Sequence, residues 1–191
     1  MQVKNAAFKS LTNSNFTIEW WEYRDNLIEN TATFVWESGV AIGWYDNNHP
    51  NFTNFAIGSD GSSWNIIRNT YCIPIKLKQW VHYALVRTDT AILLYSNGTL
   101  IKSVSVPLST TIPNINTANI DTFSFDGGPA YYDEIRVSNI ARYTSNFTPP
   151  TTQFNVDDNT ISLCHFDKQY QAKDAIIKNA WSSTGLPQPS N

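Results

Sequence analysis

The 191-residue chain carries a formal net charge of −3, and 15% of its residues are charged while 14% are aromatic. Its 13 lysines and arginines are scattered and form no basic block, so nucleic acid is not expected as a partner. No apolar run approaches the ~20 residues that span a bilayer, and the first twenty residues lack the basic start and apolar middle of a secretion signal. We therefore expect no membrane insertion and no signal peptide.

Composition also bounds the fold. A chain of this length can form one domain with a sizeable core, because all-β sandwiches commonly reach ~200 residues as a single unit. Aromatic and β-branched residues are interspersed with many Asn, Ser and Thr residues, which favours strands joined by polar turns. No long stretch has helical periodicity. The sequence therefore predicts an all-β protein.

The N-terminal half contains one strong strand pattern. Residues 8–11 predict a short first strand, and residues 16–23 alternate over their whole length. One face of the second stretch carries Phe16, Ile18, Trp20 and Glu22, and the other carries Thr17, Glu19, Trp21 and Tyr23. Because both faces carry tryptophan, we expect a strand in the middle of a sandwich, buried on one side and partly covered on the other.

Turn residues divide the rest of the chain into further strands. The Asn97–Gly98 pair predicts a tight hairpin, because both residues tolerate positive φ, and Ser38–Gly39 predicts another. Pro50 excludes a central strand from the polar loop at residues 46–51. The expected strands are residues 31–37, 40–45, 52–57, 63–69, 79–87, 91–96, 99–106, 120–125, 131–138 and 160–167.

The stretch Ala130–Pro150 combines a strand with an irregular exit. Strict alternation places Asp133 on the same face as Ile135 and Val137, which should point into a core. A buried carboxylate needs partners, so we expect hydrogen bonds to Asp133 from a neighbouring loop, from Arg136 or from Arg142.

Several strings of this sequence resemble laminin-G-like, concanavalin A-like jelly rolls, in the version common in bacteriophage tail and other virion proteins. The resembling strings are Phe16–Trp21, Trp80–Arg87 with Leu94–Gly98, Asp133–Arg136 with Ala141–Tyr143 and Phe147–Pro150, and Leu163–Asp167. The resemblance implies a two-sheet antiparallel β-sandwich over residues 1–167, in which the last strand returns to pair near the N-terminus. The polar tail at residues 168–191 is expected to pack loosely or to contact a partner.

Catalytic residues are not expected. Hydrolases of this fold typically carry Glu-x-Asp-x-x-Glu along one strand, and the sequence has no such motif. Glu19 and Glu22 should lie on opposite faces, and so should Asp133 and Glu134. His82 is more readily explained as a hydrogen-bonded core or interface residue than as a base, and so is His165. A glycoside hydrolase assembled from distant strands remains an alternative.

Sugar binding requires an aromatic face for the pyranose C–H groups and polar side chains for its hydroxyls. Two stretches combine these residue types, with the alternative that their aromatics are core. The candidates are Trp44, Tyr45, Asn47, His49, Trp64, Asn69 and Tyr71. Trp20, Trp36 and Trp80 lie in strongly patterned strands and should be buried, whereas Trp44 and Trp64 adjoin turns and can be exposed.

Calcium is a further possibility, since many laminin-G-like domains bind it. Asp126, Asp133 and Asp167 could supply oxygen ligands together with carbonyls of the Gly127–Gly128 turn. The alternative is that these carboxylates brace turns and loops. No cofactor is required by the sequence.

Cys72 and Cys164 are the only two cysteines. Their neighbours suit strands, which favours two buried free thiols, and a disulfide that closes the long intervening loop is the alternative.

These observations lead to one main hypothesis and two alternatives. The main hypothesis is a non-enzymatic recognition domain of a phage tail or other virion component that binds host surface carbohydrate. The alternatives are a structural virion protein that binds another virion protein or a second copy of itself, and a bacterial polysaccharide-binding module. The expected location is the virion or the cell exterior.

Overall fold

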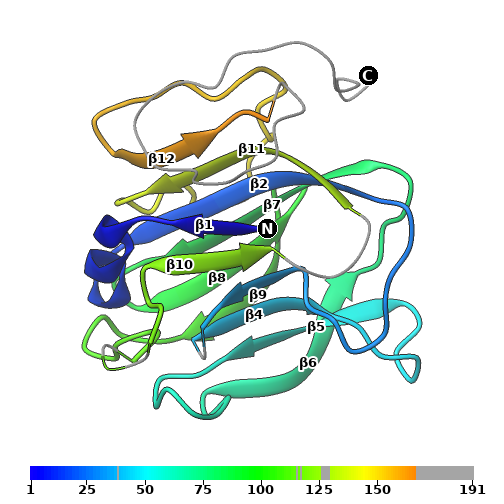
Figure 1. The fold of residues 1–191 in the computed structure, drawn as a ribbon, viewed down its shortest axis with the longest axis horizontal. Helices are drawn as coiled ribbons and strands as arrows, with labels where there is room; N and C mark the ends of the chain where they lie inside the picture. The colour runs from blue at the N-terminus through cyan, green and yellow to red at the C-terminus, as the bar shows by residue number, and fades with distance from the viewer. Residues whose placement is uncertain (38, 115, 117, 126–129, 167–191) are drawn as a thin grey trace.

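Two antiparallel six-stranded sheets pack face to face in the computed structural model, which confirms the predicted all-β sandwich (Figure 1). The structure describes residues 1–166 apart from residues 38, 115, 117 and 126–129. The first sheet contains, in spatial order, β1 (Gln2–Lys4), β10 (Thr122–Phe125), β3 (Phe34–Trp36), β4 (Val40–Trp44), β5 (Phe52–Ile57) and β6 (Ile67–Pro74). The second contains β12 (Thr160–Cys164), β11 (Ala130–Ser138), β2 (Phe16–Arg24), β7 (Trp80–Arg87), β8 (Ala91–Ser96) and β9 (Thr99–Ser105).

An aromatic core fills the space between the sheets. Trp20 of β2 stacks on Phe34 with 5.3 Å between ring centroids and meets Phe125 edge-on at 5.4 Å. Trp36 meets Phe123 edge-on at 5.0 Å and donates its indole N–H to a backbone carbonyl at 2.9 Å. These rings are almost completely buried. The inward face predicted for residues 16–23 is therefore confirmed, and so is the burial of Trp20 and Trp36.

The hairpin at Asn97–Gly98 is also confirmed. Asn97 has φ 47° and Gly98 has φ 72°, which places both residues in the left-handed region. A Cβ atom on Gly98 would lie 1.8 Å from the carbonyl oxygen of Phe147, so only glycine fits there.

Residues 8–11 form part of a 3-10 helix (Ala6–Asn13), so the predicted first strand is wrong. Asn5 caps this helix by accepting a hydrogen bond from the N–H of Ala7 at 3.0 Å. Phe8 and Leu11, three residues apart, are then both buried on one side of the helix.

Two other strand predictions need correction. The strand expected at residues 63–69 begins only at Ile67, because Asp60 accepts hydrogen bonds from the N–H groups of Ser62 and Ser63 and holds them in a turn. The last strand, β12, pairs with β11 at a sheet edge rather than near the N-terminus. β1 pairs with β10 instead.

A β-bulge at Glu134 overturns the predicted faces of β11. Glu134 has φ 52°, and the pairing with β2 shifts between Asp133 and Arg136. The extra residue places Asp133 on the outer face of the sheet, while Tyr132 and Ile135 pack toward the core. Asp133 and Glu134 line the same hollow, so the prediction that they point to opposite sides is also wrong.

The carboxylate of Asp133 accepts a hydrogen bond from the N–H of Glu134 at 2.9 Å. Arg136 and Arg142, which were expected to donate hydrogen bonds to Asp133, pair with other carboxylates. Arg136 lies 2.7 Å from Glu19, and Arg142 lies 2.7 Å from Asp157.

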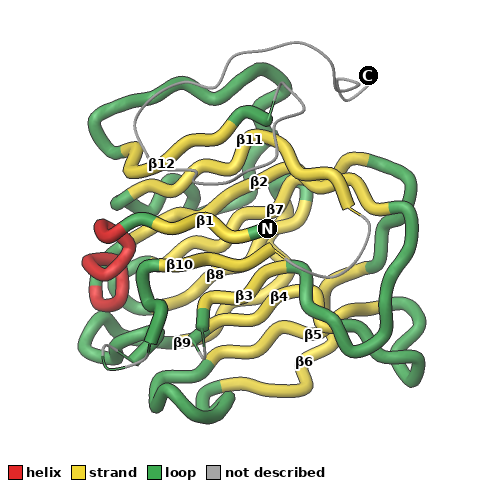
Figure 2. The backbone as a smooth tube through the Cα atoms, in the orientation of Figure 1, coloured by secondary structure: helices red, strands yellow, loops and turns green. Residues whose placement is uncertain are grey.

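A long loop at residues 139–159 connects β11 to β12 and has no regular structure (Figure 2). It covers part of the outer face of the second sheet, where Tyr143 and Phe147 stack on each other at 3.6 Å and pack against buried residues of β7 and β8. Phe147 donates its N–H to the carbonyl of Gly98 at 2.9 Å. We call residues 139–159 the covering loop.

The covering loop passes beside Trp80 at residues 150–153 and covers it only in part. That side chain is half-buried on the outer face, so its predicted full burial is wrong.

Both cysteines are free, as the favoured interpretation of the sequence predicted. Cys164 is buried in the core, whereas Cys72 is only partly buried and packs against the core. The predicted tail at residues 168–191 lies outside the described residues. Among the residues that the structure describes, no helix is both long and apolar enough to span a membrane.

Candidate functional site

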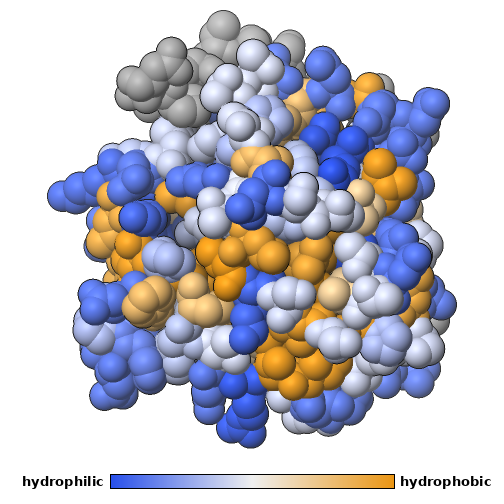
Figure 3. All heavy atoms as spheres, turned by 180° about the vertical axis from the view of Figure 1, so that it is seen from behind, coloured by the Kyte–Doolittle hydropathy of each residue, from blue (hydrophilic) through white to orange (hydrophobic). Residues whose placement is uncertain are grey.

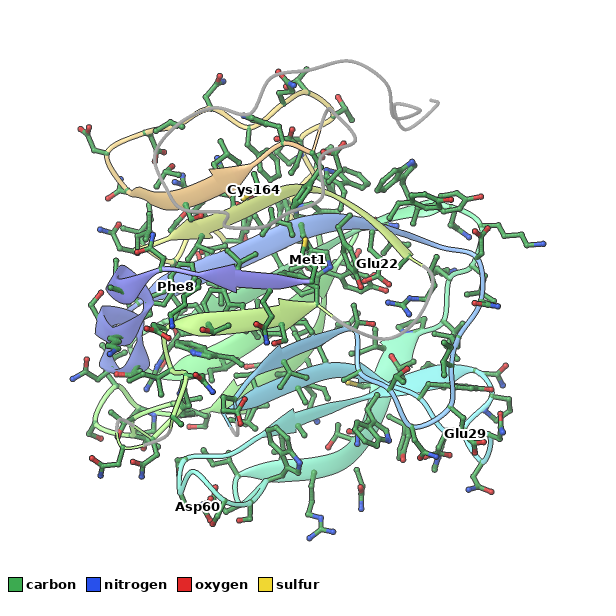
Figure 4. All side chains as sticks on the ribbon, in the orientation of Figure 1. Met1, Phe8, Glu22, Glu29, Asp60 and Cys164 are labelled. Carbon is green, nitrogen blue, oxygen red and sulfur yellow. The ribbon has the colours of Figure 1, made fainter. Side chains whose placement is uncertain are left out.

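Three loops meet at one end of the sandwich, which we call the loop end. Residues 25–33, 45–51 and 75–79 connect successive strands there. Backbone hydrogen bonds join them: Tyr45 donates to Thr31 at 3.1 Å, and residue 75 donates to residue 51 at 3.1 Å. Glu29 lies at this end and Asp60 at the opposite one (Figure 4).

Trp44 lies on the outer face of the first sheet because of a bulge. Gly43 has φ 81°, and the pairing of β4 with β5 shifts between residues 42 and 44, so Trp44 does not follow Ile42 into the core. A Cβ atom on Gly43 would lie 2.2 Å from Thr33 Oγ1, so glycine is required. As a result, 41% of Trp44 is exposed.

Trp44, Asn54 and Tyr71 are register partners across β4, β5 and β6. Directly opposite residues of antiparallel strands point to the same face, so the two aromatic side chains flank Asn54. The Asn54 side chain is nearly buried and accepts a hydrogen bond from the N–H of Thr70 at 2.8 Å. This row therefore has an aromatic side chain at each end and a fixed amide between them.

Asp46 holds two aromatic rings together at the loop end. Its carboxylate lies 2.9 Å from His49 Nδ1 and accepts a hydrogen bond from the Tyr71 hydroxyl. The His49 and Tyr71 rings are stacked, with centroids 3.4 Å apart and planes inclined by 7°. Asp46 also accepts the N–H of Asn48 at 2.8 Å, which fixes the loop backbone.

These contacts shift ionisation at the surface. The hydrogen bonds from Tyr71 and then from His49 lower the pKa of Asp46, because both stabilise its charged form. The same carboxylate raises the pKa of Tyr71. Asp46 is therefore a carboxylate and Tyr71 a neutral phenol near neutral pH.

Five of the seven predicted sugar-binding residues gather here. They are Trp44, Tyr45, Asn47, His49 and Tyr71, and Tyr45 donates its hydroxyl hydrogen to Asn47 at 3.0 Å. With Asp46, these residues form what we call the loop-end site. Sequence reasoning missed Asp46, although its position three residues before His49 in a polar turn is a usable signal.

Trp64 and Asn69 lie elsewhere. Trp64 follows the far end of β5, on the Asp60 turn, and is half-buried. Asn54, which pairs with Trp44, is three residues from that end, so roughly 10 Å of strand and the turn separate the two tryptophans. Asn69 is exposed in β6 at φ 53°, where it takes part in a bulge.

The two buried carboxylates of β2, Glu19 and Glu22, lie on opposite faces of the strand, as predicted, and each has an internal partner. On the outer face, Glu19 accepts hydrogen bonds from Arg136 Nε at 2.8 Å and from the Tyr143 hydroxyl at 2.8 Å. Glu22, on the inner face, accepts a hydrogen bond from Arg24 Nε at 2.7 Å.

Burial by itself would raise the pKa of Glu19, but His82 and Arg136 outweigh it, so the pKa is lowered. His82 Nε2 lies 3.3 Å from Glu19 Oε2 without the alignment of a hydrogen bond. Burial outweighs the contribution of Arg24 and raises the pKa of Glu22. Both acids are buried and paired, as structural groups are, whereas a catalytic pair must be accessible to the substrate.

The other predicted core histidine, His165, lies 2.6 Å from Glu134 through its Nδ1. Of the calcium candidates, Asp126 and Asp167 lie outside the described residues, and Asp133 lines the hollow beside the Glu134 bulge. Within the described part of the chain, no three His, Cys, Asp or Glu side chains are grouped as metal ligands.

Most of the chain matches a known protein family. Residues 2–146 match the family described as the concanavalin A-like lectin/glucanases superfamily. The chain belongs to this superfamily. The match covers β1 to β11 and the start of the covering loop, and it agrees with the observed two-sheet sandwich.

Solved structures of low sequence identity share this fold. One is a putative carbohydrate binding protein from Bacteroides ovatus ATCC 8483, with 18% identity and a TM-score of 0.61, where the match covers 87% of this chain and 49% of that one. Another is a receptor binding domain, with 14% identity, a TM-score of 0.51 and coverage of 73% and 36%.

The superfamily member described here thus spans about half or less of the solved chains it resembles. No curated protein sequence gives a significant match.

Proposed function

We propose that the chain is a non-enzymatic recognition domain that binds carbohydrate at the loop-end site. The observation that supports this most is the placement of an exposed tryptophan, Trp44, in the same cross-strand row as Tyr71, whose ring stacks on His49 and is held with it by one carboxylate. An exposed aromatic face with fixed polar groups beside it is the combination that sugar rings require.

Each part of the site has a role in this proposal. The indole of Trp44 takes the C–H face of a pyranose ring, which is apolar and flat enough to stack. Asp46 and the amide of Asn47 bind hydroxyl groups, since a carboxylate accepts and an amide both donates and accepts. The contacts among Asp46, His49 and Tyr71 exist before any ligand arrives, so little side-chain freedom is lost on binding.

The absence of catalysis is part of the same proposal. Glu19 and Glu22 are buried and are paired with Arg136 and Arg24, which leaves them poorly placed to protonate or attack a sugar. The name of the Bacteroides ovatus protein is consistent with binding rather than hydrolysis. A reducing-sugar assay on the polysaccharides that bind would detect catalysis if it occurs.

We further propose that the domain belongs to a phage tail or other virion component and acts on host surface glycan. This part is supported by the strings around Trp20, Trp80, Asp133 and His165 that resemble phage domains. Mass spectrometry of purified particles would detect the chain if it is a virion component. A structural role against another virion protein would appear instead as a stable complex that sugar does not compete with.

Calcium at Asp126, Asp133 and Asp167 remains a sequence-based prediction. Calcium ligands must be oxygen atoms in a set of six to eight, and Asp133 supplies at most two of them. If the ion orders the loops, EDTA will weaken sugar binding and added calcium will restore it. Equal affinity with EDTA and with calcium would remove calcium from the proposal.

A glycan array followed by titration calorimetry tests the central part. We expect Trp44→Ala to weaken binding of the best array ligand by about tenfold or more, because the stacking surface is lost. Trp64→Ala is the matched control, since it removes another tryptophan at the opposite end and should leave affinity unchanged. No binding across the array, or equal losses for the two variants, would contradict the proposal.

A further inference from the structure

A second row of aromatic side chains lies on the outer face of the second sheet. Tyr131, Tyr23 and Trp80 are register partners across β11, β2 and β7. The ring centroids are 6.0 Å apart between the two tyrosines and 5.8 Å apart between Tyr23 and Trp80. Tyr131 is 51% exposed, and the other two are half-buried. We call these three residues the aromatic row.

The path of the covering loop explains why this row is partly exposed. Farther along the same face, the loop places Phe147 and Phe154 edge-on against His82, with centroids 5.7 and 6.2 Å away, and His82 is completely buried. Between these two phenylalanines, the loop passes beside Trp80 at residues 150–153. The aromatic row therefore stays partly open to solvent, whereas His82, the next outward residue of β7 after Trp80, is completely buried.

A small hollow adjoins the row. Its walls are Trp21 and Trp80 on the sheet side, Asp133 and Glu134 at the bulge, and residues 150–153 of the covering loop. The enclosed volume is about 20 Å³, enough for one water molecule but not for a sugar ring. A ligand would therefore lie on the aromatic surface and extend at most one polar group into the hollow.

We propose that the aromatic row is a second carbohydrate-binding surface that takes one uncharged pyranose unit. The wall of the hollow combines carboxylate, hydroxyl and amide groups from Asp133, Thr151 and Gln153, which can bind sugar hydroxyls next to an aromatic face. The surface does not depend on the loop-end site, because it lies on the other sheet.

The angles between the rings limit the ligand to one unit. The ring planes are inclined by 63° between the tyrosines and by 59° between Tyr23 and Trp80. Three rings at such angles form a corner rather than a flat platform. One pyranose can stack on one ring, but a straight chain of several units cannot stack on all three.

Charge limits the ligand further. Asp133 and Glu134 both line the hollow, so a sugar carboxylate beside them would be repelled. A neutral pyranose instead offers hydroxyl hydrogens, which carboxylates accept. We therefore expect methyl pyranosides of neutral sugars to bind better than methyl glucuronide.

A sugar fits this surface better than a protein partner does. The row is not part of an extensive apolar face, since tyrosine hydroxyls, a carboxylate and threonines surround it. On the face of the molecule seen from behind, hydrophobic side chains gather in separate patches divided by polar ones (Figure 3). Protein interfaces of standard size need a larger continuous area.

Two-dimensional NMR of the tryptophan indole N–H groups tests the proposal on the full chain. The probes are the methyl glycosides of glucose, galactose, mannose and N-acetylglucosamine, with methyl glucuronide as the anionic comparison. Signals are assigned with single Trp→Phe variants. We expect the Trp80 and Trp21 signals to shift with at least one neutral probe at millimolar concentration, and to shift less with methyl glucuronide.

Variants locate the binding surface. Trp80→Ala or Tyr131→Ala should lower the affinity for the probe sugar that shifts the Trp21 signal by about tenfold. Trp44→Ala should leave the shift of the Trp21 signal unchanged. Tyr131→Phe keeps the ring and is the conservative control, with little loss expected. This comparison separates the aromatic row from the loop-end site, so either can fail while the other stands.

Three results would overturn the proposal. The first is no shift of Trp80 or Trp21 with any neutral probe. The second is a shift that Trp80→Ala and Tyr131→Ala leave intact. The third is a concentration-dependent self-association that Tyr131→Ala abolishes and sugar does not affect, which would assign the row to a protein contact.

Discussion

Two parts of the outer face of the second sheet lie on the same two strands, β2 and β7, but differ in exposure. Under the covering loop, Glu19 and His82 are completely buried, and Glu19 accepts hydrogen bonds from Arg136 and Tyr143. At the loop end, Tyr23 and Trp80 on the same two strands are only half-buried. The difference arises because the covering loop crosses only part of this face. Exposure here is thus a property of tertiary coverage, and a strand's own pattern does not determine it.

The largest expected effect is on stability in the covered part. Glu19→Ala leaves Arg136 and the Tyr143 hydroxyl without their carboxylate, and breaking such a buried pair costs about 3–5 kcal/mol in free energy of unfolding. Urea unfolding followed by circular dichroism measures this loss. Glu29→Ala is the control, since Glu29 is exposed and its removal should change stability by less than about 0.5 kcal/mol. Equal losses would contradict the assignment of Glu19 as a structural residue.

The next effect concerns the attachment of the covering loop. Gly98→Ala forces a Cβ atom against the Phe147 carbonyl at a positive φ, and we expect a loss of about 1–3 kcal/mol. Because Phe147 is anchored at this turn, limited proteolysis within residues 139–159 should become faster. Unchanged proteolysis in a destabilised variant would mean that the turn does not anchor the loop.

Acid should weaken the covered part through Glu19. In the folded state its pKa lies below the ordinary glutamate value of 4.5, so the unfolded chain binds more protons as the pH falls below 4.5. The stability that Glu19 contributes is therefore present above pH 4.5 and lost as the pH falls through the folded pKa. We expect Glu19→Gln to reduce the difference in Tm between neutral and acidic solution. An unchanged pH profile would contradict this role.

The smallest effect on stability is expected in the open part. Tyr131→Ala removes a half-exposed ring at the end of its row, so the free energy of unfolding should change by less than about 1 kcal/mol. A loss comparable with that of Glu19→Ala would mean that the row stabilises the fold and would remove the contrast between the two parts.

Alternation predicts much of this sandwich but fails where a bulge intervenes. The inward face of β2 and the hairpin at Asn97–Gly98 follow from period and turn chemistry, which act locally. A single residue in the left-handed region, Gly43 or Glu134, reverses the face of its neighbours, and the alternation pattern does not reveal it.

The loop-end site is predictable in composition but only partly in geometry. Trp44 and His49 are near in sequence, so their proximity follows from one polar loop. The stacking of His49 on Tyr71 depends on the pairing of β5 with β6. Because the two residues are far apart in the sequence, the local pattern does not predict this contact. Trp64 has the same local composition but lies at the opposite end, because β5 runs between the two stretches.

Hydrogen–deuterium exchange with and without the best array ligand reports where carbohydrate binds without any substitution. We expect the ligand to slow exchange at residues 44–49 and around Tyr71, while the turn at residues 59–66 exchanges at the same rate. Protection confined to residues 59–66, or no change at residues 44–49 under saturating ligand, would contradict this expectation.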